Sequence, residues 1–298
     1  MYKLSVIIPF KDGKAYISRF LEGVSSQSLD KENYELIFVS NNTTDSSLEE
    51  IRTYCKKIKN AYIYVFNEKK GSYAARNYGI IKAKNEILVF IDIDCKMTSE
   101  FLVKLYDLFN NKNINAVAGK ITLEINDISN EWEIYDFYAN LNNERMLQKN
   151  RVATANFSIR KDIVNVIGMF SEFISSGDSE FGERLASNNI KIVYEPNIEV
   201  LHPTRKNYES IKNKLTRIAY GEGQRANKEE KFRYKYIIIY FLKAINIVNL
   251  IRLWKKMKKH IKFHCFLIFA FRFTGIRMKQ IVSFQRGYLD TDSAKYNL

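Results

Sequence analysis

The stretch Ile87-Leu88-Val89-Phe90-Ile91-Asp92-Ile93-Asp94 joins a continuous apolar run to two carboxylates. A short apolar run rich in β-branched and aromatic residues is typical of a strand that is buried on both faces, as in a parallel sheet. Two carboxylates separated by one residue at the end of such a strand place hard oxygen ligands at one point outside the sheet, which suits a divalent cation. Taken alone, the same Asp-Ile-Asp is equally typical of a solvated turn.

Strands and helices alternate on both sides of this stretch. Leu4–Ile8 and 34–39 have strand patterns, and Tyr16, Phe20 and Val24 recur between them at helical spacing. The sequence further predicts a helix over 48–57, a strand over 61–66, a helix over 73–83, a helix from about 98 to 109 and a strand over 116–123. This alternation predicts an α/β fold with a mixed, mostly parallel sheet flanked by helices.

Polar residues follow three of these strands. Pro9–Gly13 follows the first strand, Asn41–Asp45 the second, and Asp92–Asp94 the stretch quoted above. In open α/β sheets ligands bind outside the carboxyl ends of the strands. The three loops therefore predict one binding site, and a Mg²⁺ or Mn²⁺ ion held there by carboxylates would bind together with a diphosphate.

Several segments resemble, in the family's own order, the motifs of the family 2 glycosyltransferases. They are Ser5-Val6-Ile7-Ile8-Pro9-Phe10, Glu35-Leu36-Ile37-Phe38-Val39-Ser40-Asn41-Asn42-Thr43-Thr44-Asp45, Gly71-Ser72-Tyr73-Ala74-Ala75-Arg76-Asn77-Tyr78-Gly79, Ile91-Asp92-Ile93-Asp94, Ala155-Asn156-Phe157-Ser158-Ile159-Arg160-Lys161 and Ser176-Gly177-Asp178-Ser179-Glu180-Phe181. The resemblance covers residues 1–204 and implies a GT-A domain, a Rossmann-like fold of nucleotide-diphospho-sugar transferases. It implies a nucleotide-sugar-binding half over about 1–115 and an acceptor-side half over about 116–204.

The same resemblance implies roles for single residues. Asp178 would be the general base that takes the proton of an acceptor hydroxyl as its oxygen attacks the anomeric carbon, with inversion. A Mn²⁺ or Mg²⁺ ion would neutralise charge on the departing diphosphate. The implied metal ligands are Asp92, Asp94 and His202. The implied nucleotide-sugar-binding residues are Pro9, Phe10, Asn41, Arg76, Asn77, Asp92 and Asp94.

Two of these assignments have structural alternatives, and two positions depart from the family pattern. Asp178 also suits the N-cap of a helix that begins near Glu180, and a lone His202 is also typical of a purely structural residue. Asn41 stands where the family commonly has an acidic residue, so a UDP-sugar is the expected donor but the base stays open. Gly177 stands where the family usually has Glu, which affects how the base is oriented.

The net charge of +14 lies in the last third of the chain. Residues 205–298 carry 22 basic and 6 acidic side chains, against 25 and 27 in residues 1–204. From Tyr236 onward an apolar sequence is interrupted by polar residues at helical spacing, which predicts a basic amphipathic helix. These polar residues are Lys243, Asn246, Asn249, Arg252, Lys256 and Lys259. We expect 205–298 to lie on an anionic membrane surface; the alternative is a helical hairpin that packs on the catalytic domain or on a second subunit.

Trp132, Tyr135 and Tyr138 have the spacing of an apolar helix face, and we expect them to pack on the sheet rather than to bind the acceptor. Three distant cysteines and an N-terminus that lacks signal-peptide features indicate a cytoplasmic protein, peripheral on the inner face of the membrane.

Together these observations predict a metal-dependent, inverting glycosyltransferase that acts on a lipid-linked glycan in cell-surface polysaccharide or glycolipid synthesis, without a nucleic-acid partner. One alternative is a sugar nucleotidyltransferase, although Phe10-Lys11-Asp12-Gly13 lacks the Gly-rich loop that such enzymes resemble. The other is a nucleic-acid-binding protein that uses the basic residues 205–298, which only their charge supports.

Overall fold

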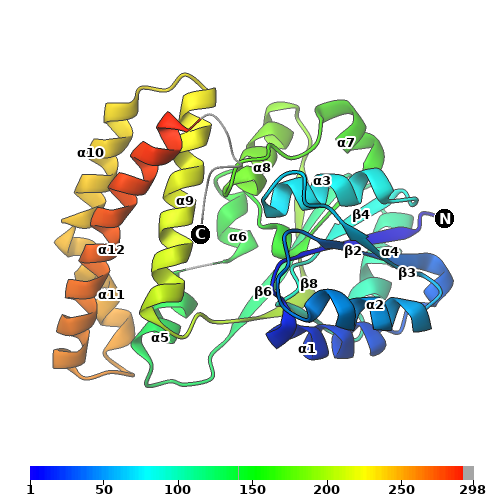
Figure 1. The fold of residues 1–298 in the computed structure, drawn as a ribbon, viewed down its shortest axis with the longest axis horizontal. Coiled ribbons are helices and arrows are strands. Elements are labelled where there is room, and N and C mark those ends of the chain that lie inside the picture. Colours follow the sequence, from blue (N-terminus) through cyan, green and yellow to red (C-terminus); the bar gives the residue numbers. More distant parts are fainter. Residues whose placement is uncertain (140, 291–298) are drawn as a thin grey trace. The chain divides into compact units, whose positions relative to one another are not determined.

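The structure is a computed structural model that describes residues 1–139 and 141–290 (Figure 1). The chain forms two compact units. The first, the sheet unit, contains Met1–Thr122, Leu141–Glu172 and Gly177–His202, and the second, the helical unit, contains Leu123–Asn140, Phe173–Ser176 and Pro203–Leu298. The last crossing between the units lies close to the domain boundary predicted at Thr204. The sequence placed 123–140 in the catalytic domain, whereas these residues group with the helical unit.

An eight-stranded mixed sheet runs through the sheet unit, in the order β3-β2-β1-β4-β7-β6-β8-β5. The strands are β1 (Leu4–Phe10), β2 (Tyr34–Ser40), β3 (Ala61–Val65), β4 (Ile87–Phe90), β5 (Lys96–Met97), β6 (Ala116–Glu124), β7 (Phe157–Arg160) and β8 (Ile192–Pro203). β1 pairs in parallel with β2 and β4, and β2 with β3. β7 is antiparallel to β4 and β6, and β5 to β8. The predicted mixed sheet is confirmed, and β3, β2, β1 and β4 form a parallel part within it.

Helices cover both faces of this sheet (Figure 1). They are α1 (Lys14–Ser25), α2 (Ser47–Lys57), α3 (Ser72–Lys82), α4 (Phe101–Asn111), α6 (Asn143–Leu147), α7 (Lys161–Ile167) and α8 (Gly177–Ser187). Successive side chains of a strand point to opposite faces. Val6 and Ile8 of β1 therefore share a core with residues of α1, α2 and α4, whereas Ile7 packs with residues of α3, α7 and α8. Burial of each such apolar side chain contributes about 1.5–3 kcal/mol.

The helical unit has its own aromatic core. Its helices are α5 (Glu131–Ala139), α9 (Tyr208–Lys228), α10 (Arg233–Ala244), α11 (Ile247–Met257) and α12 (Phe263–Leu289). Trp132 and Tyr135 of α5 are buried, as predicted, but they pack against Phe269 and Phe273 of α12 rather than against the sheet. The prediction of a core role is confirmed, and the predicted partner is corrected.

The predicted basic amphipathic helix is divided into α10 and α11, with a bend of 46° between them. Asn246 causes the restart, because its side chain accepts a hydrogen bond from the Asn249 N–H and so caps the first turn of α11. In the described part of the chain no single helix has the length and apolarity to cross a membrane; only α10 and α11 taken together meet that test, by length and composition alone.

Candidate active site

Asp94 and His202 meet at the edge of the sheet where β4 ends. The Nε2 atom of His202, on β8, lies 3.4 Å from the Oδ2 atom of Asp94. Cys95 completes a group whose potential ligand atoms all lie within 4.8 Å of one another. His202 is buried, whereas Asp94 is partly exposed, so a ligand can reach this pair from solvent.

The donor atoms of this pair fit a divalent cation. Mn²⁺ binds both carboxylate oxygen and imidazole nitrogen, and Mg²⁺ prefers carboxylate oxygen. Two neighbouring ligand atoms of an octahedral ion with bonds of about 2.1 Å are about 3 Å apart, close to the 3.4 Å between Asp94 and His202. Burial raises the pKa of the Cys95 thiol well above its usual range, and Mg²⁺ and Mn²⁺ prefer oxygen and imidazole ligands to sulfur. Asp94 and His202 could therefore hold the ion, while Cys95 packs behind them.

Asp92 lies in a different contact from the one predicted. Its carboxylate forms an ion pair with Arg76, whose side chain is buried on α3. The Arg76 guanidinium also lies 5.3 Å from the centre of the Tyr73 ring. In the described residues Asp92 is therefore outside the metal-ligand group, and Arg76 links the loop after β4 to the residues around Asp178.

Asp178 lies in the first turn of α8 and is held by three donors. Its Oδ1 atom accepts hydrogen bonds from the Tyr73 hydroxyl at 2.8 Å and from the Ser179 N–H at 2.8 Å, and its Oδ2 atom is 3.5 Å from the Thr154 N–H. Helix α8 begins at Gly177, so Asp178 is inside the helix and is not its N-cap.

Desolvation raises the pKa of Asp178 above its usual range, although the hydrogen bond from Tyr73 and the charge of Arg76 oppose this shift. A buried carboxylate with a raised pKa is a better base at neutral pH than an ordinary exposed Asp. Tyr73 received no role from the sequence, although it lies within a quoted motif. It contacts a residue far along the chain, and only the fold brings the two together.

Gly177 has no room for a side chain in this backbone. A Cβ atom there would lie 2.6 Å from the Ser171 carbonyl oxygen and 2.9 Å from the Tyr73 ring. The Ser171 carbonyl oxygen and the Tyr73 ring together occupy the space that a side chain at position 177 would need. Glycine at this position therefore lets the segment around Ser171 and the Tyr73 ring pack close beside Asp178.

The side-chain amide of Asn41 binds backbone groups. Its side-chain nitrogen donates to the carbonyls of Phe66 at 2.6 Å and Lys69 at 2.8 Å, and its oxygen accepts from the Gly71 N–H at 2.9 Å. The side chain is also buried. Both N–H donors of the amide therefore hold the loop between β3 and α3, and its oxygen can accept one further hydrogen bond. Its contact with the base of the donor stays a prediction.

Asn77, Pro9 and Phe10 are also buried. Asn77 donates to the Phe170 carbonyl at 2.9 Å and accepts from the Phe170 N–H at 3.0 Å, so it joins α3 to the segment before α8. The Phe10 ring belongs to the core, and its carbonyl accepts the Asn41 N–H at 2.9 Å. These residues shape the loops of the site, and their contact with a nucleotide stays a prediction.

Residues 5–168 match the model of Glycosyl transferase family 2. The chain belongs to this family. The match spans more than half of the chain, and it includes β1 and β4 with the aspartates that follow β4. Membership of this family makes the chain a glycosyltransferase, which decides against a sugar nucleotidyltransferase and against a protein that only binds nucleic acid.

Comparison with single proteins extends the likeness beyond residue 168. "Glycosyltransferase AglE" of Haloferax volcanii is 30% identical over 223 residues, which are 74% of this chain and 72% of that protein. The mannosyltransferase PcManGT of Pyrobaculum calidifontis, solved with GDP-Man and Mn²⁺, aligns with 97% of this chain and 87% of its own at a TM-score of 0.65 and 13% identity. TarS of S. aureus (residues 1–349), solved with UDP-GlcNAc, aligns with 96% of this chain and 90% of its own at 0.56 and 16%. The family 2 chain therefore has the GT-A fold of these glycosyltransferases.

Proposed function

We propose that this family 2 glycosyltransferase is metal-dependent and inverting, and transfers a sugar from a nucleoside-diphosphate sugar to an acceptor hydroxyl. The observation that carries this proposal is Asp178, a partly buried carboxylate whose pKa desolvation raises and which accepts a hydrogen bond from the Tyr73 hydroxyl. Such a group can accept a proton and is fixed in one orientation before the substrate arrives.

The proposed reaction is a single displacement. The acceptor oxygen forms a bond to the anomeric carbon while its proton passes to Asp178, and the bond from that carbon to the diphosphate oxygen breaks. Attack from the face opposite the leaving group inverts the anomeric centre. A Mn²⁺ or Mg²⁺ ion held by Asp94 and His202 would supply positive charge for the departing diphosphate.

The nature of the donor base is not set by the fold, since PcManGT was solved with GDP-Man and TarS with UDP-GlcNAc. A UDP-sugar remains the donor that we propose. Asn41, the residue at which the sequence departs from the family, is engaged with backbone, so backbone groups of the loops after β1 and β2 would contact the base.

We further propose a lipid-linked glycan acceptor in cell-surface polysaccharide or glycolipid synthesis, and a location on the inner face of the cell membrane. The helical unit supports this, because α11 exposes Ile247, Val248 and Ile251 by 69%, 57% and 49% beside its basic residues. Apolar side chains beside Lys and Arg are what an anionic lipid surface binds.

The substitution Asp178→Asn tests the reaction. We expect transfer to fall by about 10²–10⁴-fold, because proton acceptance is lost, while titration with the donor and Mn²⁺ is unchanged. Asp107→Asn, at an exposed carboxylate of α4, is the matched control and should transfer normally. If Asp178→Asn keeps transfer within about tenfold of the unchanged protein, Asp178 is not the base.

A further inference from the structure

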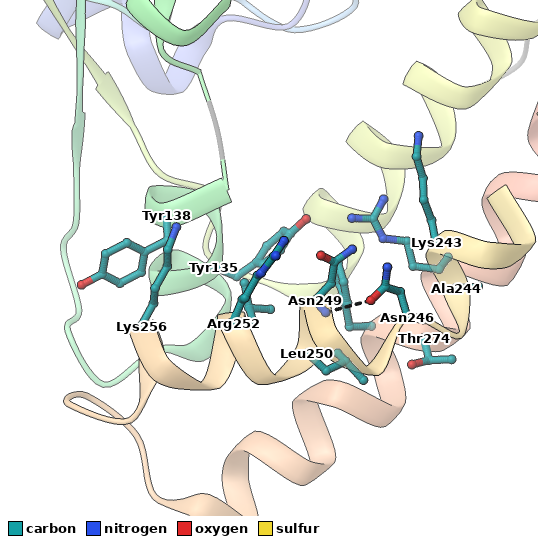
Figure 2. A pocket seen from close by; sticks show the side chains of 13 residues that line it. Tyr135, Tyr138, Lys243, Ala244, Asn246, Asn249, Leu250, Arg252, Lys256 and Thr274 are labelled. Carbon is teal, nitrogen blue, oxygen red and sulfur yellow. Dashed lines mark hydrogen bonds between the residues drawn. The ribbon is translucent and has the colours of Figure 1, made fainter. Parts of the chain in front are cut away.

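A cavity of about 240 Å³ that opens to solvent lies among α5, α10, α11 and α12 of the helical unit (Figure 2). Four cationic side chains line it: Lys243 of α10, Arg252 and Lys256 of α11, and Arg277 of α12. Of these, Lys243, Arg252 and Lys256 are exposed. Tyr135 and Tyr138 of α5 line it as well. The cavity is smaller than the roughly 300–1,000 Å³ of pockets that enclose whole cofactors or drug-sized ligands, so its size suits a small anionic group.

The positions on α11 show that the cations are gathered on one face. Asn249, Arg252 and Lys256 are three and four residues apart, which places them on the same side of a helix. Figure 2 shows these three side chains rising from one side of α11. Like charges four residues apart on a helix repel each other, so Arg252 and Lys256 destabilise α11 slightly, and a bound anion would reduce this repulsion.

The residues that line the cavity include no carboxylate. Residues 231–289, which contain α10, α11 and α12, include no Asp or Glu. Glu222 of α9 accepts a hydrogen bond from the Tyr240 hydroxyl of α10 and is not part of the lining. Arg277 donates to the Gln280 side-chain oxygen at 2.9 Å and lies 4.7 Å from the centre of the Phe273 ring, both of which are neutral partners. The lining therefore carries positive charge that none of its own residues offsets.

We propose that this cavity binds a phosphate or diphosphate group carried by a lipid. Phosphate oxygens accept several charge-assisted hydrogen bonds at once, and Arg guanidinium groups match their geometry. A lipid rather than a free anion is the source that we infer, because Val248, one turn before Arg252 on the same side of α11, is an apolar side chain that is 57% exposed. The inference rests on the proposed function only in taking this lipid to be the carrier of the acceptor.

The test removes two of the four charges and compares two sources of phosphate. The variant Arg252→Gln with Lys256→Gln is matched by Lys255→Gln with Lys259→Gln, which removes the same charge at exposed positions outside the cavity lining. The probes are inorganic phosphate, phosphatidylcholine vesicles with phosphatidic acid, and such vesicles with oleic acid at equal surface charge. EDTA is present throughout, so the metal site does not contribute.

We expect the full-length protein to bind phosphatidic acid vesicles more tightly than oleic acid vesicles, and the cavity variant to lose about tenfold or more of that affinity and of its affinity for phosphate. The control variant should keep its preference for phosphatidic acid. Equal losses in both variants would show diffuse charge and overturn the site. A loss for inorganic phosphate alone would overturn the lipid source.

Thermal unfolding checks that both variants fold. Donor titration with Mn²⁺ should be the same in both, because Asp94 and His202 belong to the sheet unit. These measurements separate the two proposals. If the protein binds phosphatidic acid through the cavity but transfers no sugar, the proposed reaction is wrong and the cavity site stands. If it transfers sugar but the cavity does not bind phosphatidic acid, only the cavity site is wrong.

Discussion

The two units differ in how their charged side chains are paired. In the sheet unit the charged and polar groups near the ends of the strands have fixed partners, as in Arg76 with Asp92 and Tyr73 with Asp178. In the helical unit, residues 231–289 carry many cations and no carboxylate. The polar groups of the sheet unit are therefore held in place before a ligand binds. In the helical unit, we propose that a bound anion offsets part of the positive charge of the cavity.

Ion pairs with fixed partners also occur in the helical unit. Asp136 is buried and forms ion pairs with Lys214 at 3.0 Å and Arg205 at 3.3 Å. Desolvation lowers the pKa of Lys214 to about 8, and Asp136 opposes that shift. Glu229, just after α9, pairs with Arg225 and Lys231. These pairs involve α5, α9 and the residues after α9, whereas the residues that line the cavity include no carboxylate.

The largest effect on donor binding is expected from Asp94→Ala. If the pair with His202 holds the ion, the variant should bind the donor with Mn²⁺ about a hundredfold more weakly or worse, because a metal contributes several kcal/mol. Isothermal titration with and without Mn²⁺ measures this. Lys255→Ala, at an exposed cation of the helical unit, should leave the titration unchanged. If Asp94→Ala leaves the donor affinity with Mn²⁺ unchanged, the proposed metal site of the sheet unit is wrong.

A smaller effect is expected from Gly177→Ala, which should destabilise the protein, whereas the same substitution at Gly275 of the helical unit should stabilise it. The new Cβ atom would lie 2.6 Å from the Ser171 carbonyl oxygen, so unfolding free energy should fall by about 1–3 kcal/mol and transfer should fall with it. Gly275, on α12, has nothing within 4 Å of such an atom, and Gly275→Ala should stabilise by about 0.4–1 kcal/mol. Urea unfolding curves of both variants decide whether the packing around Asp178 is as tight as described.

The smallest effect is expected from Tyr73→Phe, as a shift of pH dependence. Asp178 must be a carboxylate to accept a proton, so activity falls as the pH falls through its pKa, which desolvation has raised. The Tyr73 hydrogen bond lowers that pKa, so its removal should move the acid limb of kcat/KM to higher pH and leave the plateau in place. A profile that keeps its acid limb but loses height would show that Tyr73 only supports the structure.

The strands and most helices of the sheet unit were predictable, because each is an apolar run or an apolar stripe bounded by loop residues. The edge at which the site lies followed from the same pattern. The hydrogen bonds of Asn41 and Asn77 to backbone carbonyls could not be predicted from residue type and position, because an amide can bond either backbone or a ligand and only the fold shows its neighbours. The bend at Asn246 was missed because a capping residue within a polar stripe looks like one more member of that stripe.

Tyr73 and Gly177 share one space, and this has a consequence for the history of the family. A side chain at position 177 needs space that the Tyr73 ring and the Ser171 carbonyl oxygen fill, so a larger residue there requires both a smaller residue at position 73 and a shift of the backbone at Ser171. Relatives with a larger residue at the place of Gly177 should carry a smaller one at the place of Tyr73, as a pair that varies together. Where both are exchanged, a new side chain inherits the task of orienting the base.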